Sequence, residues 1–440
     1  MLINTVRLRK TSASRMLFFK YQRPDNLAFS MLRNGEIYFA SVDELNDASE
    51  CRPRFVFRGS EELWQRLAHY ILFEACLSSD YFRPDRMDAI SGILNISNRV
   101  GTSLKKAAGN KDIGIEKLNS LFIAALEEHL ADEKQDFSRG FVTHLVRNYI
   151  QAVLPRAVKE DKFIASFSLN ATNPTMWGHY SAAERGFLVV YDSPDESIHV
   201  HSPINLLHGS RPSKNMEGCT EIGTYRDEHL GLEQVDYGRR PPKVNAFHRL
   251  IHKFSYSEEE DHYDVPLLIA GDAAEKKEAL VGLVKYSDWR YEKEVRAFFP
   301  AYNSVLPDGR VLQVDLANML GVVFGPRMSN EDKARAVLCC HLLVESRDQG
   351  AVDRKEMMFF QARQTIDRFD FDILPVGALD KHYLSGHLPV KPVSKLDPED
   401  VKRFQSVARS IAESGSKRPA GNQKGEQGGG GQPATRSESI

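Results

Sequence analysis

The 440-residue chain carries 58 lysine and arginine residues against 60 aspartate and glutamate residues, so its formal net charge is only −2. This balance excludes a global field that would draw the whole chain to nucleic acid or to an acidic membrane surface, so any such affinity must come from a local patch. The length allows one large domain with an insertion, or a few smaller domains. No targeting segment and no run of about 20 apolar residues is present, and we expect a soluble, cytoplasmic protein.

The cysteines argue against a disulfide-stapled protein. Their number is odd, their spacing is irregular and two of them are adjacent, so a disulfide framework is not expected. We expect reduced thiols at Cys51, Cys76, Cys219, Cys339 and Cys340.

The first part of the chain, residues 1–57, has apolar and aromatic runs typical of short strands. We expect strands over residues 17–21, 36–40 and 55–57, with a short helix over residues 27–32. These elements form the N-terminal part of a β-rich domain.

Residues 58–160 change to helical periodicity. Apolar side chains recur at intervals of three and four residues over 63–73, 118–130 and 141–153, which predicts amphipathic helices. We interpret this block as a helical insertion between two parts of the β-rich domain.

Strand patterns return in residues 161–411, the remainder of that domain. The expected strands are 163–168, 186–191, 281–286, 294–299, 311–314 and 320–324, followed by a helix over about 330–346. The predicted fold class is therefore α+β, with a mixed, mostly antiparallel sheet. Residues 412–440 hold few apolar side chains and cannot bury enough surface to offset their ordering entropy, so we predict a disordered C-terminal tail.

The most distinctive local pattern is the heptapeptide from Thr175 to Ser181. Trp177 and Tyr180 stand three residues apart and share one helix face, which predicts that they anchor this helix on the sheet, with Trp177 buried. His179 lies beside them. Two interpretations fit it, a hydrogen-bonded packing residue or a catalytic group.

A second pattern combines two carboxylates with a guanidinium group. In a strand every second side chain points the same way, so Glu292, Glu294 and Arg296 are expected on one face. Burial of such charges is costly unless they pair with one another or serve a ligand. A structural ion pair and a functional site are therefore both open.

Together these patterns resemble a bacterial family of domains of unknown function, number 2971. The resemblance rests on an ordered series of short motifs, namely Phe19-Lys-Tyr21, Ile37-Tyr-Phe39, Leu45-Asn-Asp47 with Glu50, Phe167-Ser168, Met176-Trp-Gly-His-Tyr180, and Trp289 followed by Tyr291-Glu-x-Glu-x-Arg296. Ala48 stands where the family usually has proline, and the helical block is not part of the signature. The family carries no established activity.

A more distant resemblance is to mono-ADP-ribosyltransferases, which arrange an early Arg or His, a Ser-x-Ser strand and a late Glu-x-Glu around the nicotinamide of NAD. Here Lys20, Ser166-Phe-Ser168 and Glu292-Lys-Glu294 follow in that order, although lysine lacks the planar fork of arginine. In such enzymes a carboxylate stabilises the cationic ribose, and a preceding glutamate activates the acceptor. The resemblance implies an NAD-dependent transferase, a toxin or phage-defence effector, that modifies an unknown macromolecule.

This resemblance also implies the roles of particular residues. It makes Glu294, Glu292 and His179 catalytic. The cofactor-binding residues that it implies are Lys20, Tyr21, Ser166, Ser168, Trp177, Tyr180 and Arg296, and it needs no metal. It requires side chains that are far apart in sequence, Lys20, Ser168, His179 and Glu294 among them, to converge on one cleft.

Two other functions fit the same sequence. One is a non-catalytic module that binds protein or nucleic acid, with the basic stretch Arg239–Lys253 as a local patch. The other is a metal-dependent nuclease or hydrolase that uses Asp47, Glu50 and Glu292. His248 and His252 have the i, i+4 spacing of a metal-binding pair, but no third ligand is apparent, and a solvated or packing pair explains them better.

Overall fold

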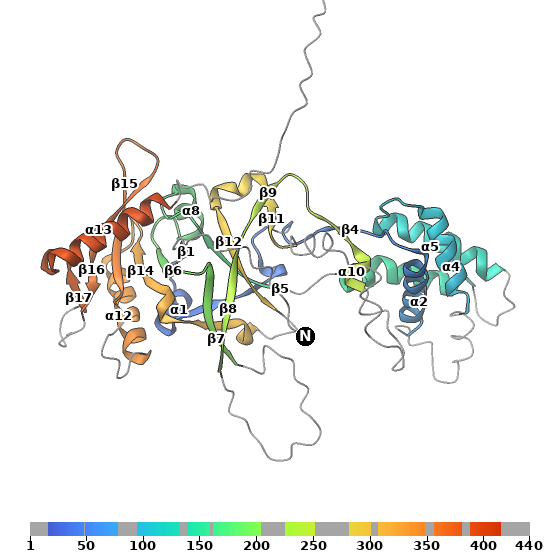
Figure 1. Cartoon of the computed structure of the whole chain (residues 1–440), viewed down its shortest axis with the longest axis horizontal. Coiled ribbons are helices and arrows are strands. Elements are labelled where there is room, and N and C mark those ends of the chain that lie inside the picture. The colour runs from blue at the N-terminus through green and yellow to red at the C-terminus, as the bar shows by residue number, and fades with distance from the viewer. Residues whose placement is uncertain are drawn as a thin grey trace, which may run out of the picture.

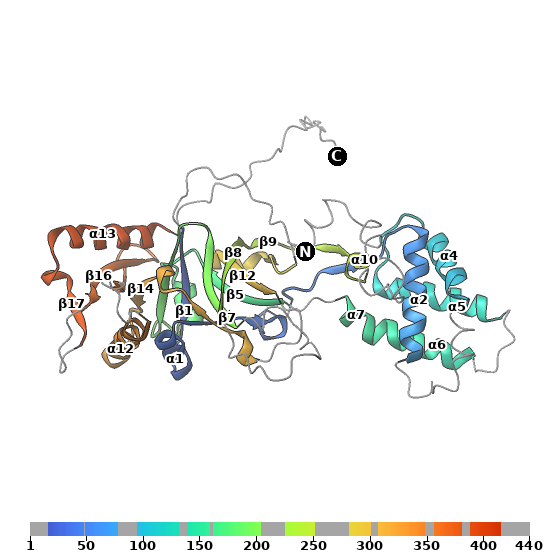
Figure 2. The same ribbon diagram turned by 60° about the horizontal axis from the view of Figure 1, so that its bottom comes forward.

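The computed structural model describes residues 16–47, 49–77, 95–131, 139–158, 162–203, 225–250, 281–300, 307–347, 356–380 and 388–414. A large β-sheet occupies one end of an elongated molecule and a group of helices occupies the other. The two parts keep these places in both views of the ribbon (Figures 1 and 2).

The secondary structure alternates short strands with helices of varied length. The strands are β1 (Met16–Gln22), β2 (Glu36–Tyr38), β3 (Ala40–Ser41), β4 (Arg54–Val56), β5 (Lys162–Ser168), β6 (Phe187–Ser193), β7 (Ser197–Pro203), β8 (Tyr225–Gln234), β9 (Asp236–Gly238), β10 (Lys243–Asn245), β11 (Val284–Tyr286), β12 (Glu294–Pro300), β13 (Val311–Val314), β14 (Met319–Phe324), β15 (Met358–Gln364), β16 (Phe371–Leu379) and β17 (Val390–Pro392). The α-helices are α1 (Asn26–Asn34), α2 (Glu61–Leu77), α4 (Ser97–Ala108), α5 (Ile115–Ala131), α6 (Arg139–Asn148), α7 (Leu154–Ala157), α8 (Pro174–Tyr180), α10 (Ala246–Leu250), α12 (Asn330–Arg347) and α13 (Pro398–Glu413). The 3-10 helices are η1 (Val42–Glu44), η6 (Ser287–Glu292), η7 (Pro307–Arg310), η8 (Leu316–Asn318) and η9 (Val393–Lys395), and η3 (Tyr149–Val153) is a π-helix.

The main sheet has the strand order β17-β16-β15-β14-β6-β1-β5-β12-β8-β7-β13-β2, and β3 pairs with β5 beside this path. Among the described strands of this sheet, β14 and β15 are parallel and the other neighbours are antiparallel. The mixed, mostly antiparallel α+β fold predicted from the sequence is therefore confirmed. Because β1, β5 and β12 are adjacent, three segments far apart in the chain lie side by side.

The strand predictions succeed in the middle of the sheet and at its β13–β2 edge, and they miss several strands elsewhere. The runs 163–168, 294–299 and 320–324 correspond to β5, β12 and β14. Residues 281–283 form a turn, and only the end of the predicted strand 281–286 is extended, as β11. Strands β7, β8, β15 and β16 and helix α13 were not predicted.

Two helical layers cover the main sheet. Alternation along β1 points Phe18 to one face and Phe19 to the other. The Phe18 face is packed by α1 and α12, whereas the Phe19 face is packed by α8 and α13. On the second face Trp177 of α8 is fully buried, as expected from its place beside Tyr180.

Residue choices at its start fix where α8 begins. The Asn173 side chain accepts hydrogen bonds from the backbone N–H groups of Thr175 (2.8 Å) and Met176 (3.3 Å), and Pro174 supplies a preset φ in the first turn. The cap sets the register of the helix, so that Trp177 points into the core and Tyr180, three residues on, lies above it.

The helices between β4 and β5 have a core of their own. Trp64 of α2, Phe122 of α5 and Ile150 of η3 are among its fully buried members. Phe57 and Phe247 of α10 complete this core, and the Phe247 ring meets Trp64 edge-on at 5.4 Å between centroids. Residues 243–250, which the sequence placed in the second part of the β-rich domain, therefore pack with the helical block. The parallel pair β4–β10 leads into it.

The structure tests the predicted disordered tail, residues 412–440, only at its first residues. Helix α13 continues to Glu413 and buries Ile411, so residues 412 and 413 belong to a packed helix rather than to a tail. Residues 415–440 lie outside the described part of the chain. None of the described helices is long and apolar enough to cross a membrane.

The thiols agree with the expectation of reduced cysteines where they are described. Cys51, Cys339 and Cys340 are free and buried. The side chains of Cys76 and Cys219, and His252 of the predicted histidine pair, lie outside the described residues.

Candidate functional site

The motifs singled out in the sequence meet where β1, β5 and β12 lie next to one another. In the antiparallel register Glu294 pairs with Ser168, and Arg296 pairs with Ser166. Residues in such pairs have Cα atoms about 4.5–5.5 Å apart. The expected convergence of Ser168 and Glu294 is therefore present, and Lys20 on β1 joins them by donating a 2.9 Å hydrogen bond to the Ser166 carbonyl.

Glu292 reaches the same place by a route that strand alternation did not predict. It is the last residue of η6 rather than part of a strand, and Lys293 after it adopts a left-handed conformation with φ 44°. The Ser168 hydroxyl donates a 2.6 Å hydrogen bond to the Glu292 carbonyl, which ties this turn to the end of β5. The prediction that Glu292 and Glu294 share one strand face was wrong, but a turn brings their carboxylates together.

A buried cluster of five charged side chains forms at this junction. Its members are Glu50, Lys285, Glu292, Glu294 and Arg296, each no more than 5% exposed. We call it the charge cluster. The Lys285 ammonium lies among the three carboxylates, at 2.7 Å from Glu50, 2.6 Å from Glu292 and 3.3 Å from Glu294.

Arg296 closes the charge cluster from the other side. Its Nε donates to Glu294 Oε1 at 2.7 Å and its Nη2 donates to Glu294 Oε2 at 3.0 Å, a bidentate pair. Nη2 also pairs with Glu50, and Nη1 donates to the Gly282 carbonyl at 2.6 Å. Three carboxylates face two cations, so the charge cluster carries a formal excess of one negative charge.

Sequence reasoning missed Lys285. It lies on β11, which pairs in parallel with β9, and its ammonium lies 4.9 Å from the centre of the Trp289 ring. This contact explains why Trp289 accompanies the acidic motif. The available signal was a lone lysine within an apolar run, which is a costly position for a charge without a partner.

The two glutamates of the motif have opposite pKa shifts. Burial alone would raise the pKa of Glu294, but the charges of Arg296 and Lys285 and the hydrogen bond from Arg296 outweigh it and hold the pKa at about 2. Burial raises the pKa of Glu292, and the nearby Lys285 only partly offsets this. Burial also lowers the pKa of Lys20 to about 8, against the attraction of Glu294.

A pocket of about 160 Å³ opens onto one side of the charge cluster, and we call it the small pocket. All but two of the predicted site residues line this pocket. Those that line it are Lys20, Tyr21, Ser166, Ser168, Tyr180, Glu292, Glu294 and Arg296. The Tyr180 hydroxyl donates to Glu292 Oε1 and accepts a 2.6 Å hydrogen bond from the Asn46 amide. Asn46 is thus a further residue of the site, supplied by the turn that follows η1.

The two exceptions are Trp177 and His179. Trp177 has no exposed surface, donates its indole N–H to the Ala171 carbonyl at 2.8 Å and packs edge-on against Tyr21. It supports the pocket from beneath and does not contact its interior. His179 is exposed and its Nδ1 lies 3.3 Å from the Tyr291 hydroxyl, outside the pocket lining. The role that the resemblance implies for each of these two residues stays a prediction.

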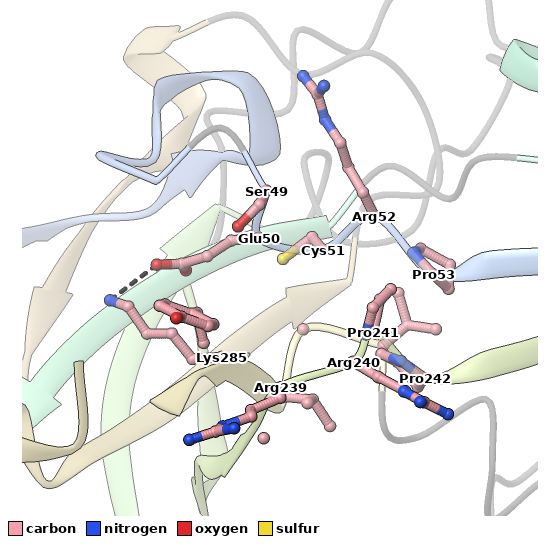
Figure 3. A pocket seen from close by; sticks show the side chains of 15 residues that line it. Ser49, Glu50, Cys51, Arg52, Pro53, Arg239, Arg240, Pro241, Pro242 and Lys285 are labelled. Carbon is pink, nitrogen blue, oxygen red and sulfur yellow. Dashed lines mark ion pairs between the residues drawn. The ribbon is translucent and has the colours of Figure 1, made fainter. Parts of the chain in front are cut away.

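A second pocket, of about 560 Å³, lies on the other side of the charge cluster (Figure 3). We call it the large pocket. Glu50 and Lys285 line both pockets and form the wall between them. Arg52, Arg239 and Arg240 also line the large pocket, and no described residue gives their guanidinium groups a hydrogen bond or ion pair. In Figure 3 Arg52 extends from the segment on one side of the hollow, while Arg239 and Arg240 extend in opposite directions from the segment on the other side.

A match to a family model covers the centre of this arrangement. Residues 176–297 match the family described as Protein of unknown function (DUF2971). The matched stretch begins one residue before Trp177 and ends one residue after Arg296, so it contains both aromatic and acidic motifs, while Lys20 and Glu50 precede it. No curated protein and no solved structure matches the chain.

The contacts of the carboxylates bear on the metal-dependent alternative. Lys285 and Arg296 already occupy the space between Glu50, Glu292 and Glu294 that a divalent cation would need. Asp47, the remaining predicted ligand, accepts hydrogen bonds from the Ser49 backbone (2.8 Å) and hydroxyl (2.6 Å) instead. The side-chain cations of Lys285 and Arg296 therefore take the place that a metal ion would take in the nuclease or hydrolase hypothesis.

Proposed function

We propose that this protein is an ADP-ribosyltransferase-like enzyme that cleaves the bond between nicotinamide and ribose in NAD at the small pocket. The observation that carries the proposal is the pair of carboxylates, Glu292 and Glu294, whose pKa values are shifted in opposite directions within one pocket. Two carboxylates separated in this way are typical of sites that need one permanent charge and one proton-accepting group.

The charge of the site suits a cationic substrate and a cationic transition state. NAD carries a positive nicotinamide ring, and its loss leaves a positive, oxocarbenium-like ribose. Glu294, with its pKa at about 2, stays ionised at every physiological pH and is preorganised by Arg296 to stabilise that charge. The Lys20 ammonium also lines the small pocket and offsets the formal excess of one negative charge in the charge cluster, so the stabilisation proposed here comes from the local charge of Glu294.

In the rest of the reaction the acceptor is the nucleophile and Glu292 is the base that takes its proton. The bond from ribose C1′ to the nicotinamide nitrogen breaks, and its electron pair leaves with neutral nicotinamide. An oxygen or nitrogen of the acceptor, or of water, then bonds to C1′, and its proton passes to Glu292. A carboxylate with a raised pKa is the better base for this step.

The dimensions limit what the small pocket holds. A cavity of about 150 Å³ accommodates a benzene-sized ring, so a pocket of about 160 Å³ takes the nicotinamide ring but not a whole dinucleotide. The rest of NAD lies outside it.

We propose that the enzyme acts in the cytoplasm, as a toxin or a phage-defence effector with a macromolecular acceptor.

The direct test is release of nicotinamide from NAD by the purified full chain, with water as acceptor. Glu294→Gln keeps the shape of the side chain and removes its charge, so release should fall by at least tenfold. Glu233→Gln is the matched control. Glu233 on β8 lies opposite Arg296 of β12 in the antiparallel register, but it lines neither pocket. Wild-type protein that neither binds NAD nor releases nicotinamide would refute the proposal.

A second variant guards against loss of the fold in Glu294→Gln. Tyr180→Phe removes only the hydroxyl that donates to Glu292. Since that hydrogen bond lowers the pKa of Glu292, its loss should move the acid limb of the pH–rate profile to higher pH. An unchanged profile, in a variant with an unchanged melting temperature, would remove Glu292 from the mechanism.

A second candidate function, binding of a phosphate-bearing ligand such as nucleic acid, is favoured by the large pocket. Its arginines, Arg52, Arg239 and Arg240, have no described partner, and guanidinium groups are the preferred ligands of phosphate. Alanine at all three positions should weaken binding of a short oligonucleotide and flatten its salt dependence. Arg363→Ala, on the exposed side of β15, is the control. Equal binding by the triple variant and the wild type would exclude this function.

A further inference from the structure

A group of three potential metal ligands lies outside both pockets, on the neighbouring strands β7 and β8 of the main sheet and in the turn that precedes β7. His199 on β7 and His229 on β8 are direct partners in the antiparallel register, so their side chains project from the same face. Their rings stack with centroids 3.6 Å apart. Asp195, in the turn between β6 and β7, reaches the same point.

The three donor atoms have the spacing of a coordination site. His199 Nε2 lies 3.2 Å and His229 Nδ1 lies 3.8 Å from the same carboxylate oxygen, Asp195 Oδ2. All three donor atoms lie within 4.8 Å of one another. Zinc binds imidazole nitrogen at about 2.0–2.1 Å, and in a tetrahedral complex with such bonds the ligand atoms are roughly 3.3 Å apart.

The carboxylate is held so that one oxygen faces the imidazoles. Asp195 Oδ1 accepts hydrogen bonds from the hydroxyls of Ser197 (2.7 Å) and Ser193 (3.1 Å), and Oδ2 is left to the two rings. The His199 backbone is fixed in turn by a 3.0 Å hydrogen bond to the side-chain oxygen of Asn318. Outer contacts that orient ligands in this way are a regular feature of metal sites.

A simple ion pair explains only part of this geometry. A stacking contact accounts for the two rings lying together, but it does not require both of them to direct a nitrogen at the same carboxylate oxygen, Asp195 Oδ2. One cation held between the three donor atoms accounts for this convergence. The side chains are 25%, 59% and 36% exposed at His199, His229 and Asp195, so an ion can enter from solvent.

We propose that Asp195, His199 and His229 bind a divalent transition-metal ion of the zinc class. Two imidazoles and one carboxylate form a donor set that such ions favour. Three protein ligands leave a fourth position to water or to a ligand from outside. The ion fastens the β6–β7 turn to β8. None of the three ligands lines the small or the large pocket, so this proposal is independent of the NAD chemistry.

The test is calorimetric titration of the full-length, chelator-stripped protein with Zn²⁺, with the visible spectrum of added Co²⁺ as a report of coordination geometry. We expect one saturable site in the wild type and at least a hundredfold weaker binding in His199→Ala and in His229→Ala. His144→Ala is the control, because His144 lies on α6 and pairs with Asn148 instead. It should bind like the wild type.

A finer variant separates coordination from general histidine binding. Ser197→Ala leaves all three ligands in place and removes one hydroxyl from Asp195, so affinity should fall by about 10–100-fold. Circular dichroism checks that each variant is folded. No saturable Zn²⁺ binding in the wild type, or equal binding in His199→Ala and wild type, would overturn the proposal.

Discussion

Replacement of Lys285 by methionine is the sharpest test of the charge cluster. The substitution keeps most of the side-chain volume and removes the one ammonium that lies within 3.3 Å of three carboxylates. Arg296 then remains as the sole cation of the cluster. Removal of one partner from a buried ion pair costs about 3–5 kcal/mol, because the uncompensated charge stays buried. We expect a loss of free energy of unfolding in this range at neutral pH.

The matched control is the same substitution at Lys243. Its ammonium also forms a 2.7 Å ion pair, with Asp112, but the lysine side chain is 52% exposed. Exposed pairs contribute about 0–1 kcal/mol, so Lys243→Met should be nearly neutral. Urea denaturation followed by circular dichroism and by tryptophan fluorescence measures both variants, and Trp289 next to Lys285 makes the fluorescence sensitive to the cluster.

The effect of pH on Lys285→Met has a defined sign. Burial already raises the pKa of Glu292 in the intact protein, and the loss of Lys285 removes a charge that lowers it. The folded variant therefore takes up a proton more readily than the unfolded chain, and its deficit should shrink as the pH falls from 7.5 to 5. Glu294 keeps its bidentate pair with Arg296, whose charge lowers the pKa of Glu294 more than that of Lys285 does, so we expect it to stay ionised over this interval. A deficit below about 1 kcal/mol at pH 7.5, or one that grows on acidification, would refute this account of the cluster.

Three further perturbations test separate parts of the structure. Trp177→Ala should cost on the order of 3–5 kcal/mol, measured by denaturation, because it empties a fully buried site; an equally stable variant would contradict the packing role. Deletion of residues 415–440 should leave the melting temperature unchanged, whereas deletion from residue 398 removes the buried side chains of α13 and should lower it by several degrees. Lys20→Met should match or exceed the wild type in stability at pH 7, since burial lowers the pKa of Lys20 to about 8, and any advantage should vanish as the pH approaches 10.5.

The sequence predicted the centre of the fold because its strands carry strong local signals. The β-branched and aromatic runs of β5, β6, β12 and β14 are buried on both sides and leave little choice of conformation. β8, by contrast, reads Tyr-Arg-Asp-Glu-His-Leu-Gly-Leu-Glu-Gln, a polar segment whose strand character comes from its partners β7 and β12. Pairing of that kind is a tertiary effect that a single sequence does not encode locally.

The sequence predicted most residues of the candidate site, but it did not predict which of them contact one another. Spacing and motif order located Glu292, Glu294, Arg296 and the two serines, which do line one pocket. The interpretation of Glu292 as a strand residue failed because nothing in the local pattern marks Lys293 as left-handed. The partner of the carboxylates, Lys285, comes from another strand pair. His179 is exposed and contacts the Tyr291 hydroxyl, and both interpretations of it stay open.

The part played by α10 in the helical core has a consequence for how the chain folds during synthesis. When the ribosome has produced residues up to 160, the sequences of α2, α4, α5, α6 and α7 are complete, but Phe247, which packs against Trp64 and Phe57, has not yet been synthesised. Their core must wait for another 90 or so residues, during which β5 to β9 emerge and begin to pair. A gene fragment that ends at residue 160 would encode the helices with an open hydrophobic cavity, and adding residues 243–250 as a separate peptide should close it.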